Sequence, residues 1–128
     1  MADLDHFKKI NDVHGHLVGD RVLKIAATRM VSGARDDDEI CRYGGEEFLF
    51  VLEDTELAEA KDVAERVRTR IGDDAVHGRN AKIHISLSLG VAEARENDSV
   101  DALIDRADAA LYAAKLAGRN CVRLEAGQ

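Results

Sequence analysis

The residues most suited to chemistry in this sequence are carboxylates that occur in close pairs: Asp3 with Asp5, and Glu46 with Glu47. Magnesium prefers hard oxygen ligands, and one or two carboxylates usually bind it together with water and substrate phosphates. Either pair alone is more often a solvated charge pair. The second pair, however, directly follows Gly44 and Gly45. Adjacent glycines at a turn allow positive φ and let a ligand lie against bare backbone, so this segment favours a phosphate and metal site over a structural turn.

A second group of polar residues suits the recognition of a base: Asn11, Asp12, His16 and Asp20. An Asp side chain can accept hydrogen bonds from N1 and the exocyclic amine of guanine, while an Asn side chain can donate one. The alternative interpretation is local. Gly15 and Gly19 flank His16, and the same residue types commonly cap helices or form turns.

Two basic residues near the end of the chain, Lys115 and Arg119, lie on either side of Gly118. Basic residues at the C-terminus of a helix interact favourably with its dipole, which is the simplest explanation for them. The functional alternative is a pair of cations for the β- and γ-phosphates of a nucleotide. Arg35 and Asp38 look like ordinary connector residues by themselves.

Apolar spacing predicts the helices that would position these residues, at 5–14, 19–32, 56–71 and 99–117. Thr55 is a suitable N-cap for the third helix, and Gly118 stands where a C′ glycine ends the last one.

The predicted strands lie between these helices. Apolar runs on either side of the two glycines predict a β-hairpin, 40–42 with 48–52, whose second strand is buried on both faces. Residues 72–82 have the composition of a loop, 83–89 alternate as a strand does, and 121–124 form a final strand. This order predicts an α/β (α+β) sandwich, a mainly antiparallel central sheet flanked by helices.

Length and composition fit one soluble domain, with 128 residues of which 45% are hydrophobic and 34% charged. The net charge of -7 argues against a nucleic acid polymer as partner, because binding many phosphates requires an excess of Lys and Arg. One nucleotide can still bind where a metal ion and local cations neutralise it. No apolar run approaches the roughly 18 residues of a membrane span, so no membrane contact is expected. Cys41 and Cys121 are predicted to be buried free thiols rather than a disulfide or metal site.

Five segments, in order along nearly the whole chain, resemble the motifs of the GGDEF family of diguanylate cyclases. The signature is Arg42-Tyr43-Gly44-Gly45-Glu46-Glu47-Phe48, in the family's Glu variant. The other four are the segments 3–12, 15–20, 88–91 and 106–120. A lone Gly-Gly-Glu-Glu-Phe would be a weak match, whereas five motifs in the right order and spacing are specific. The resemblance implies a fold like that of nucleotidyl cyclases and the polymerase palm.

The activity that this resemblance implies is the condensation of two GTP molecules into cyclic di-GMP with release of two pyrophosphates. Each domain of a homodimer would present one GTP. The cofactor would be Mg²⁺ (or Mn²⁺), bound by these residues: Asp3, the carbonyl of Leu4, Glu46 and Glu47. Glu46 and Glu47 would also be the catalytic carboxylates, with Glu46 assisting deprotonation of the attacking 3′-hydroxyl. No covalent nucleophile is required, because phosphoryl transfer depends on alignment and charge neutralisation.

Substrate-binding roles follow from the same resemblance. Asn11 and Asp20 would read guanine, with His16 as a further member of the substrate site. The residues expected to hold phosphates, by side chain, backbone amide or bare turn, are Phe7, Lys8, Arg42, Gly44, Gly45, Lys115 and Arg119.

The resemblance also changes the interpretation of Arg35 and Asp38. The family's product-inhibition site is an Arg-x-x-Asp just ahead of the signature, and residues 35–38 have that pattern at that distance. Arg can stack on guanine and bond its Hoogsteen edge, while Asp accepts from the Watson–Crick edge. Cyclic di-GMP is therefore expected to bind here and restrain activity, with Arg66 contributing from a neighbouring domain.

The start of the chain departs from the family, whose members usually begin with a helix carrying Asp-x-Leu-Thr-x-Leu and a complete first strand. Residues 1–128 are therefore expected to be a GGDEF domain that is incomplete at its N-terminus. An upstream sensory or receiver domain is expected in the full-length chain, which would be cytoplasmic or the cytoplasmic part of a membrane-bound sensor. Two other functions stay open: a receptor that binds cyclic di-GMP without catalysis, and a structural dimerisation domain. The residues that argue against both are Glu46, Glu47, Lys115 and Arg119.

Overall fold

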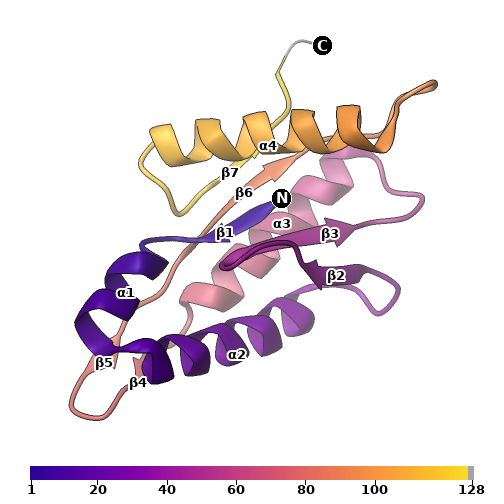
Figure 1. Cartoon of the computed structure of the whole chain (residues 1–128). Helices are drawn as coiled ribbons and strands as arrows, with labels where there is room; N and C mark the ends of the chain where they lie inside the picture. The colour runs from indigo at the N-terminus through magenta and orange to yellow at the C-terminus, as the bar shows by residue number, and fades with distance from the viewer. Residues whose placement is uncertain (127–128) are drawn as a thin grey trace.

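The fold is built on a central sheet with helices on both faces (Figure 1). A computed structural model describes residues 1–126, and no helix in that range is long and apolar enough to cross a membrane. The strands of the main sheet follow the order β2-β3-β1-β6-β7. Its pairings are antiparallel except that β6 runs parallel to β7. The predicted α/β (α+β) class with a mainly antiparallel central sheet is confirmed.

The strands of the main sheet are short: β1 (Ala2–Leu4), β2 (Glu39–Arg42), β3 (Glu47–Val51), β6 (Leu87–Val91) and β7 (Val122–Leu124). β1 lies in the middle, where Asp3 is opposite Glu47 on one side and Ser88 on the other. Successive side chains of a strand point to opposite faces, so the side chain of Asp3 faces away from those of Ala2 and Leu4 in the same strand. Because both faces are covered at this position, Asp3 is only 7% exposed.

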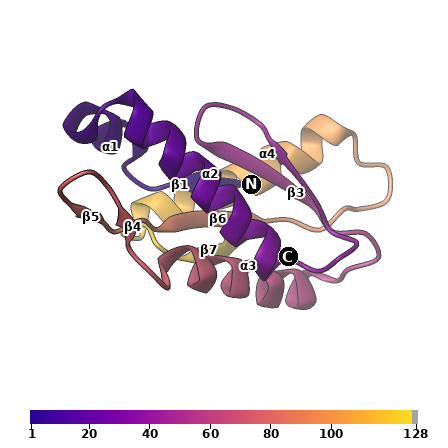
Figure 2. The same cartoon turned by 90° about the horizontal axis from the view of Figure 1, so that it is seen from below.

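The helices in the described part of the chain are α1 (Phe7–His14), α2 (His16–Gly33), α3 (Leu57–Gly72) and α4 (Val100–Leu116). α4 packs on one face of the sheet, while α2 and α3 pack against each other on the opposite face (Figures 1 and 2). The apolar core divides in the same way. The larger cluster joins Leu4 and Phe48 to α2 and α3, and the smaller one joins Met1 and Leu49 to α4.

The segment after α3 differs from the prediction. The expected loop at 72–82 and the start of the expected strand at 83–89 form a second sheet of two short strands, β4 (Val76–His77) and β5 (Lys82–Ile83). The reason is topological. β1 is so short that its pairing with β6 ends at Leu87, and the chain before that residue turns away to pair locally.

Two helix starts also differ from the prediction. α2 begins at His16 rather than at residue 19. Thr55 does not cap α3, because its hydroxyl donates to the carbonyl of Glu53 and accepts a hydrogen bond from Arg35. Glu56 occupies the N-cap position instead and makes no side-chain capping bond.

Burial departs from the prediction at two positions. Cys41 and Cys121 are free thiols, as predicted, but Cys41 is exposed and Cys121 is only partly buried. Cys41 lies on β2, which forms one edge of the sheet, so only one side of the strand is covered by a neighbour. β3 is not buried on both faces along its whole length, since Val51 is 44% exposed while Leu49 packs with the cluster under α4.

The start of α4 is fixed by a capping bond and by ion pairs. Ser99 is the N-cap and accepts a hydrogen bond from the amide of Ala102 at 3.0 Å. Arg106 donates to both carboxylate oxygens of Asp98 and also to Glu125. The hydrogen bond from Arg106 holds the pKa of Asp98 at about 2, below its ordinary value of 3.8. At the other end of the helix Gly118 has a φ of 110°, as a C′ glycine requires.

The Asp98–Arg106 pair gives a testable dependence of stability on pH. A carboxyl whose pKa is depressed by folding stabilises the native state above its unfolded pKa of 3.8, and that contribution is lost as the pH falls through about 2. We therefore expect Asp98→Asn to lower the urea midpoint at about pH 5 and to have a smaller effect at about pH 2.5. Asp105→Asn, on the exposed side of the same helix, is the control. An equal deficit of Asp98→Asn at both pH values would contradict the assignment.

Candidate active site

The carboxylates predicted to bind a metal meet where β1 faces the signature hairpin. Asp3 lies directly opposite Glu47 in the β1–β3 ladder. Side chains opposed in this way have Cβ atoms about 4.5–5.5 Å apart. The amide of Leu4 donates to the carbonyl of Glu46 at 3.1 Å. Folding thus brings the first motif and the signature side by side.

α4 adds a cation to these carboxylates. The ammonium group of Lys115 donates to the carboxylate of Asp3 at 2.7 Å, although 112 residues separate them in sequence. Burial lowers the pKa of Lys115, but the hydrogen bond and negative charge of Asp3 outweigh it, so the pKa is raised. The pKa of Glu47 is raised as well, first by burial and then by the neighbouring charge of Asp3. The site therefore concentrates negative charge that a cation would relieve.

The donor set fits a magnesium ion in its chemistry. Asp3, the carbonyl of Leu4 and Glu46 supply hard oxygens, and Glu47 lies beside them. Within residues 1–126 no group of three or more His, Cys, Asp or Glu side chains is placed to hold a metal ion. In this structure Lys115 supplies the positive charge next to Asp3.

The hairpin tip is held by Arg42 and leaves bare backbone open. The guanidinium of Arg42 donates to the carbonyls of Gly44 and Gly45, the latter at 2.6 Å. Neither glycine has a positive φ, so this turn does not use the conformational freedom that glycine allows. The turn is closed instead by the amides of Tyr43 and Gly44, which both donate to the carbonyl of Glu47. A Cβ at Gly45 would meet nothing within 4 Å, so this backbone is accessible to a ligand.

The N-terminus of α1 follows shortly after β1, at the end of the strand where Leu4 is bonded to Glu46 of the signature hairpin. Phe7 is buried in the core, so only its backbone amide is available for a ligand, while Lys8 is exposed. The first amides of a helix have no intrahelical acceptor and form an anion-binding position. His6, with a φ of 56°, makes the sharp turn from the strand into the helix.

The polar group expected to read guanine lies where α1 meets α2. The carboxamide of Asn11 packs against the backbone of Gly19, where a Cβ would overlap its Oδ1. This Oδ1 is buried and has no hydrogen-bond partner among the described residues. Asp20 and His16 are exposed on the first turns of α2. A buried oxygen without a partner is costly, which suggests that a ligand donates to it.

The loop after α4 carries the second predicted phosphate-binding residue. Arg119 and Asn120 have positive φ values of 64° and 47°, a conformation that side-chain-bearing residues rarely adopt. The amide of Arg119 donates to the carbonyl of Ala114, which closes the end of the helix. The charge of Arg119 is close enough to lower the pKa of Lys115, so the two cations lie near each other.

The Arg-x-x-Asp segment forms a tight ion pair. The guanidinium of Arg35 makes three bonds to the carboxylate of Asp38, whose side chain is only 1% exposed, and a further bond of 2.7 Å to the hydroxyl of Thr55. Burial raises the pKa of Asp38, but the hydrogen bonds from Arg35 lower it further than burial raises it. Arg66 donates to Gly33 of the same chain and also lowers this pKa, so it lies beside its own Arg-x-x-Asp segment.

Two features of these sites were not expected from the sequence. Asp5, which the sequence paired with Asp3 as a candidate metal ligand, accepts hydrogen bonds from Ser86, Ser88 and the amide of Asn120. Thr55, expected to cap a helix, orients Arg35. The sequence did contain a signal for the contacts of Asp5. Ser86 and Ser88 alternate with apolar residues just before Leu89, and a hydroxyl that becomes buried needs a hydrogen-bond partner.

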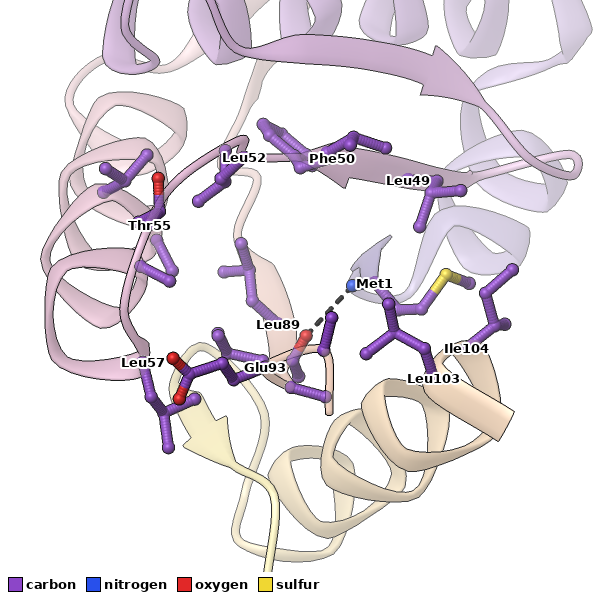
Figure 3. A pocket seen from close by; sticks show the side chains of 18 of the residues that line it. Met1, Leu49, Phe50, Leu52, Thr55, Leu57, Leu89, Glu93, Leu103 and Ile104 are labelled. Carbon is purple, nitrogen blue, oxygen red and sulfur yellow. Dashed lines mark hydrogen bonds between the residues drawn. The ribbon is translucent and has the colours of Figure 1, made fainter. Parts of the chain in front are cut away.

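A sizeable apolar cavity lies elsewhere in the described part of the chain (Figure 3). It has a volume of about 630 Å³ and lies between α3, α4, β3 and β6. The backbone nitrogen of Met1 donates to the carbonyl of Gly90 at 2.9 Å beside it. Its described lining includes no Lys or Arg, so it does not suit a triphosphate.

Comparison with known proteins identifies the family of this chain. The family model described as the diguanylate cyclase GGDEF domain matches residues 1–121. The response regulator PleD of Caulobacter vibrioides is 46% identical over 126 residues, which cover 95% of this chain and 28% of PleD. The diguanylate cyclase DgcP of Pseudomonas aeruginosa is 44% identical over 125 residues, covering 98% of this chain and 18% of DgcP. The chain thus spans less than a third of the length of either relative.

Solved structures share the fold. The GGDEF domain of DgcB from Caulobacter crescentus, in complex with c-di-GMP, superposes with a TM-score of 0.91 at 35% identity, over 96% of this chain and 74% of that one. The active GGEEF domain of a diguanylate cyclase from Vibrio cholerae gives 0.89 at 37% identity, over 99% and 81%. The predicted palm-like cyclase fold is therefore confirmed. By its motifs, its fold and its family match, the chain belongs to the GGDEF family of diguanylate cyclase domains.

Proposed function

We propose that this domain condenses two GTP molecules into cyclic di-GMP. The observation that carries the proposal is the meeting of Asp3, Glu47 and Lys115, which come from β1, the signature hairpin and α4. In each of two steps a 3′-hydroxyl attacks the α-phosphorus of the other GTP, the bond to pyrophosphate breaks, and the hydroxyl proton is released. One GTP per domain requires two domains facing each other, so the active form is a homodimer.

Guanine is selected by hydrogen-bond acceptors at the meeting of α1 and α2. The unpartnered Oδ1 of Asn11 and the carboxylate of Asp20 both accept hydrogen bonds, and guanine presents donors at N1 and its exocyclic amine. Adenine has an acceptor at N1, which would face these oxygens without a proton between them. The Oδ1 of Asn11 would then accept a hydrogen bond from guanine, whereas the sequence alone suggested that the Asn11 side chain donates one. His16 is exposed at the start of α2 and would be a further member of the substrate site.

The phosphates would extend from these base-binding residues towards the carboxylates. The free amides of Phe7 and Lys8 and the bare backbone at Gly45 would face the anion, while Lys115 and Arg119 neutralise the leaving pyrophosphate. Arg42 acts by holding the hairpin tip. Binding requires Lys115 to exchange part of its contact with Asp3 for phosphate oxygen.

Mg²⁺ (or Mn²⁺), held by Asp3, the Leu4 carbonyl and Glu46, would supply charge neutralisation at the attacking and leaving oxygens. Glu46 is the carboxylate that we assign to assisting removal of the proton from the 3′-hydroxyl. Burial, and then the charge of Asp3, raise the pKa of Glu47, and we assign to this carboxylate the role of balancing the cations around it.

The direct test is to incubate the protein with GTP and Mg²⁺ and to separate the products by liquid chromatography and mass spectrometry. We expect cyclic di-GMP and pyrophosphate in a ratio of one to two, and no cyclic product from ATP. Binding of cyclic di-GMP without any synthesis, in the chain and in a longer version of it, would favour the receptor function instead. Binding of neither nucleotide would leave a dimerisation domain.

The setting of the domain is part of the same proposal. PleD is named a response regulator, and this chain matches 28% of it. We infer that the domain is the output of a longer protein with a receiver or sensory domain upstream, and that it acts in the cytoplasm, where GTP is available.

Product inhibition at the Arg-x-x-Asp segment is supported by its geometry. Arg35 is fixed by Asp38 and Thr55, so its guanidinium plane is presented in one orientation and 32% of its side chain is exposed. The DgcB domain, which shares this fold, has been solved in complex with c-di-GMP. Arg66, beside Asp38 in the same chain, is a second cation for a phosphate of the product, and it could serve a neighbouring domain as well.

Arg35→Ala is expected to weaken binding of cyclic di-GMP at least about tenfold, because a hydrogen bond to a charged group is worth roughly 1.5–3 kcal/mol. The measurement is isothermal titration, accompanied by inhibition of GTP turnover by added product. Arg70→Ala, an exposed arginine on the same helix as Arg66, is the charge-matched control. Unchanged affinity in Arg35→Ala would rule out this site.

A further inference from the structure

Asp5 is a buried carboxylate that the proposed reaction does not use. It is 5% exposed, and its two oxygens accept three hydrogen bonds. The hydroxyls of Ser86 and Ser88 each donate at 2.6 Å, and the backbone amide of Asn120 donates at 3.0 Å. A buried carboxylate with this number of donors is held in one orientation.

The donors come from segments that are distant in sequence. Asp5 directly follows β1, the serines belong to β6 and the residues before it, and Asn120 lies in the connection from α4 to β7. The amide of Asp5 also donates to the carbonyl of Ser86, so three hydrogen bonds join this residue to Ser86 and Ser88. Figure 1 shows that the connection after α4 reaches the same end of the sheet as the start of α1.

The connection that Asp5 holds has an uncommon backbone. Arg119 and Asn120 are consecutive residues with positive φ, and neither is glycine. Such a conformation persists where the surroundings impose it. The amide of Asn120 donates to Asp5 and, at 3.2 Å, to the hydroxyl of Ser88, and these bonds fix the direction in which the preceding residue, Arg119, leaves the backbone.

We propose that Asp5 is a positioning residue that sets Arg119 against the phosphate end of the substrate site. The segment from Asp3 to Asp5 is then joined at two points to the chain around the C-terminal end of α4: Lys115 bonds to Asp3, and the amide of Asn120 bonds to Asp5. The proposal rests on the function proposed above, in which Lys115 and Arg119 hold pyrophosphate. Asp5 itself touches neither metal nor substrate.

The test separates the two ends of the substrate. Inorganic pyrophosphate with Mg²⁺ probes the cationic end by isothermal titration, and guanosine probes the residues proposed to bind the base by saturation-transfer NMR. We expect Asp5→Ala to weaken pyrophosphate about 10–100-fold, the usual cost of losing a residue that orients a binding group, and to leave guanosine affinity within about twofold. Ser88→Ala keeps Asp5 but removes one donor and one acceptor from the network, so it should fold and show a smaller loss in the same direction.

The control is Asp98→Asn, which removes a carboxylate that holds an arginine at the opposite end of α4. It is expected to lower stability and leave both affinities unchanged. The proposal is overturned if Asp5→Ala and Ser88→Ala bind pyrophosphate as the unmodified protein does, or if pyrophosphate and guanosine weaken together. Amide hydrogen exchange at Asn120 gives an independent reading, since it should accelerate in Asp5→Ala. If the unmodified protein binds no pyrophosphate, the proposed function fails, while the exchange rate still reports whether Asp5 orders the loop.

Discussion

Replacing Asp3 by asparagine is expected to lower the rate of cyclic di-GMP formation at least about a hundredfold. The carboxylate is a proposed metal ligand and the partner of Lys115, and neutralising charge at a metal site is worth several kcal/mol, where each 1.36 kcal/mol is a factor of ten. Asparagine keeps the size of the side chain, so the fold should survive. Initial rates at saturating and at limiting Mg²⁺ measure the effect.

The control for this variant is Asp62→Asn, an exposed carboxylate on α3. It removes the same charge from the opposite face of the sheet and should leave the rate within about twofold, since isolated surface charges have small effects. Thermal unfolding of Asp3→Asn should stay close to that of the unmodified protein, because its partner Lys115 is one-third exposed and can be solvated. An unchanged rate in Asp3→Asn would contradict the site.

Gly90→Ala is expected to be the most damaging small substitution for stability. A Cβ at this position would overlap the carbonyl oxygen of Ala107 and the amide nitrogen of Leu111, and would come within 2.8 Å of the carbonyl carbon of Ala110. These are backbone atoms of α4, which cannot move aside without lifting the helix from β6. Overpacking of a core commonly costs about 1–3 kcal/mol, and we expect a loss of about 3 kcal/mol or more here.

Urea unfolding measures this loss, with Gly72→Ala as the matched control. A Cβ at Gly72, the last residue of α3, would make only an ordinary contact of 3.8 Å with a carbonyl oxygen. Alanine is favoured over glycine in helices, so this change should alter stability by less than about 1 kcal/mol. Gly90→Ala should also reduce cyclase activity, because a displaced α4 carries Lys115 away from Asp3. Equal urea midpoints for the two variants would show that α4 can shift at no cost.

Much of the site was predictable because its signals are local. The glycine pair followed by carboxylates marks the hairpin tip wherever that hairpin packs, and Gly118 ends α4 as its residue type requires. The periodic apolar residues of the helices also marked their inner faces. Boundaries were less well predicted, as at β5 and β6, because a strand ends where its neighbour ends and not where its own alternation stops.

The sequence by itself determined the family, the order of elements and the residue types available for metal, base and phosphate. The tertiary structure decided which of them work together. Asp3 and Asp5 are chemically identical and nearly adjacent, yet one meets Lys115 and the other meets two serines and a backbone amide. The physical reason is that a carboxylate takes its role from the donors that reach it. Those donors arrive from β6 and α4 through long-range packing, which no local pattern of residues specifies.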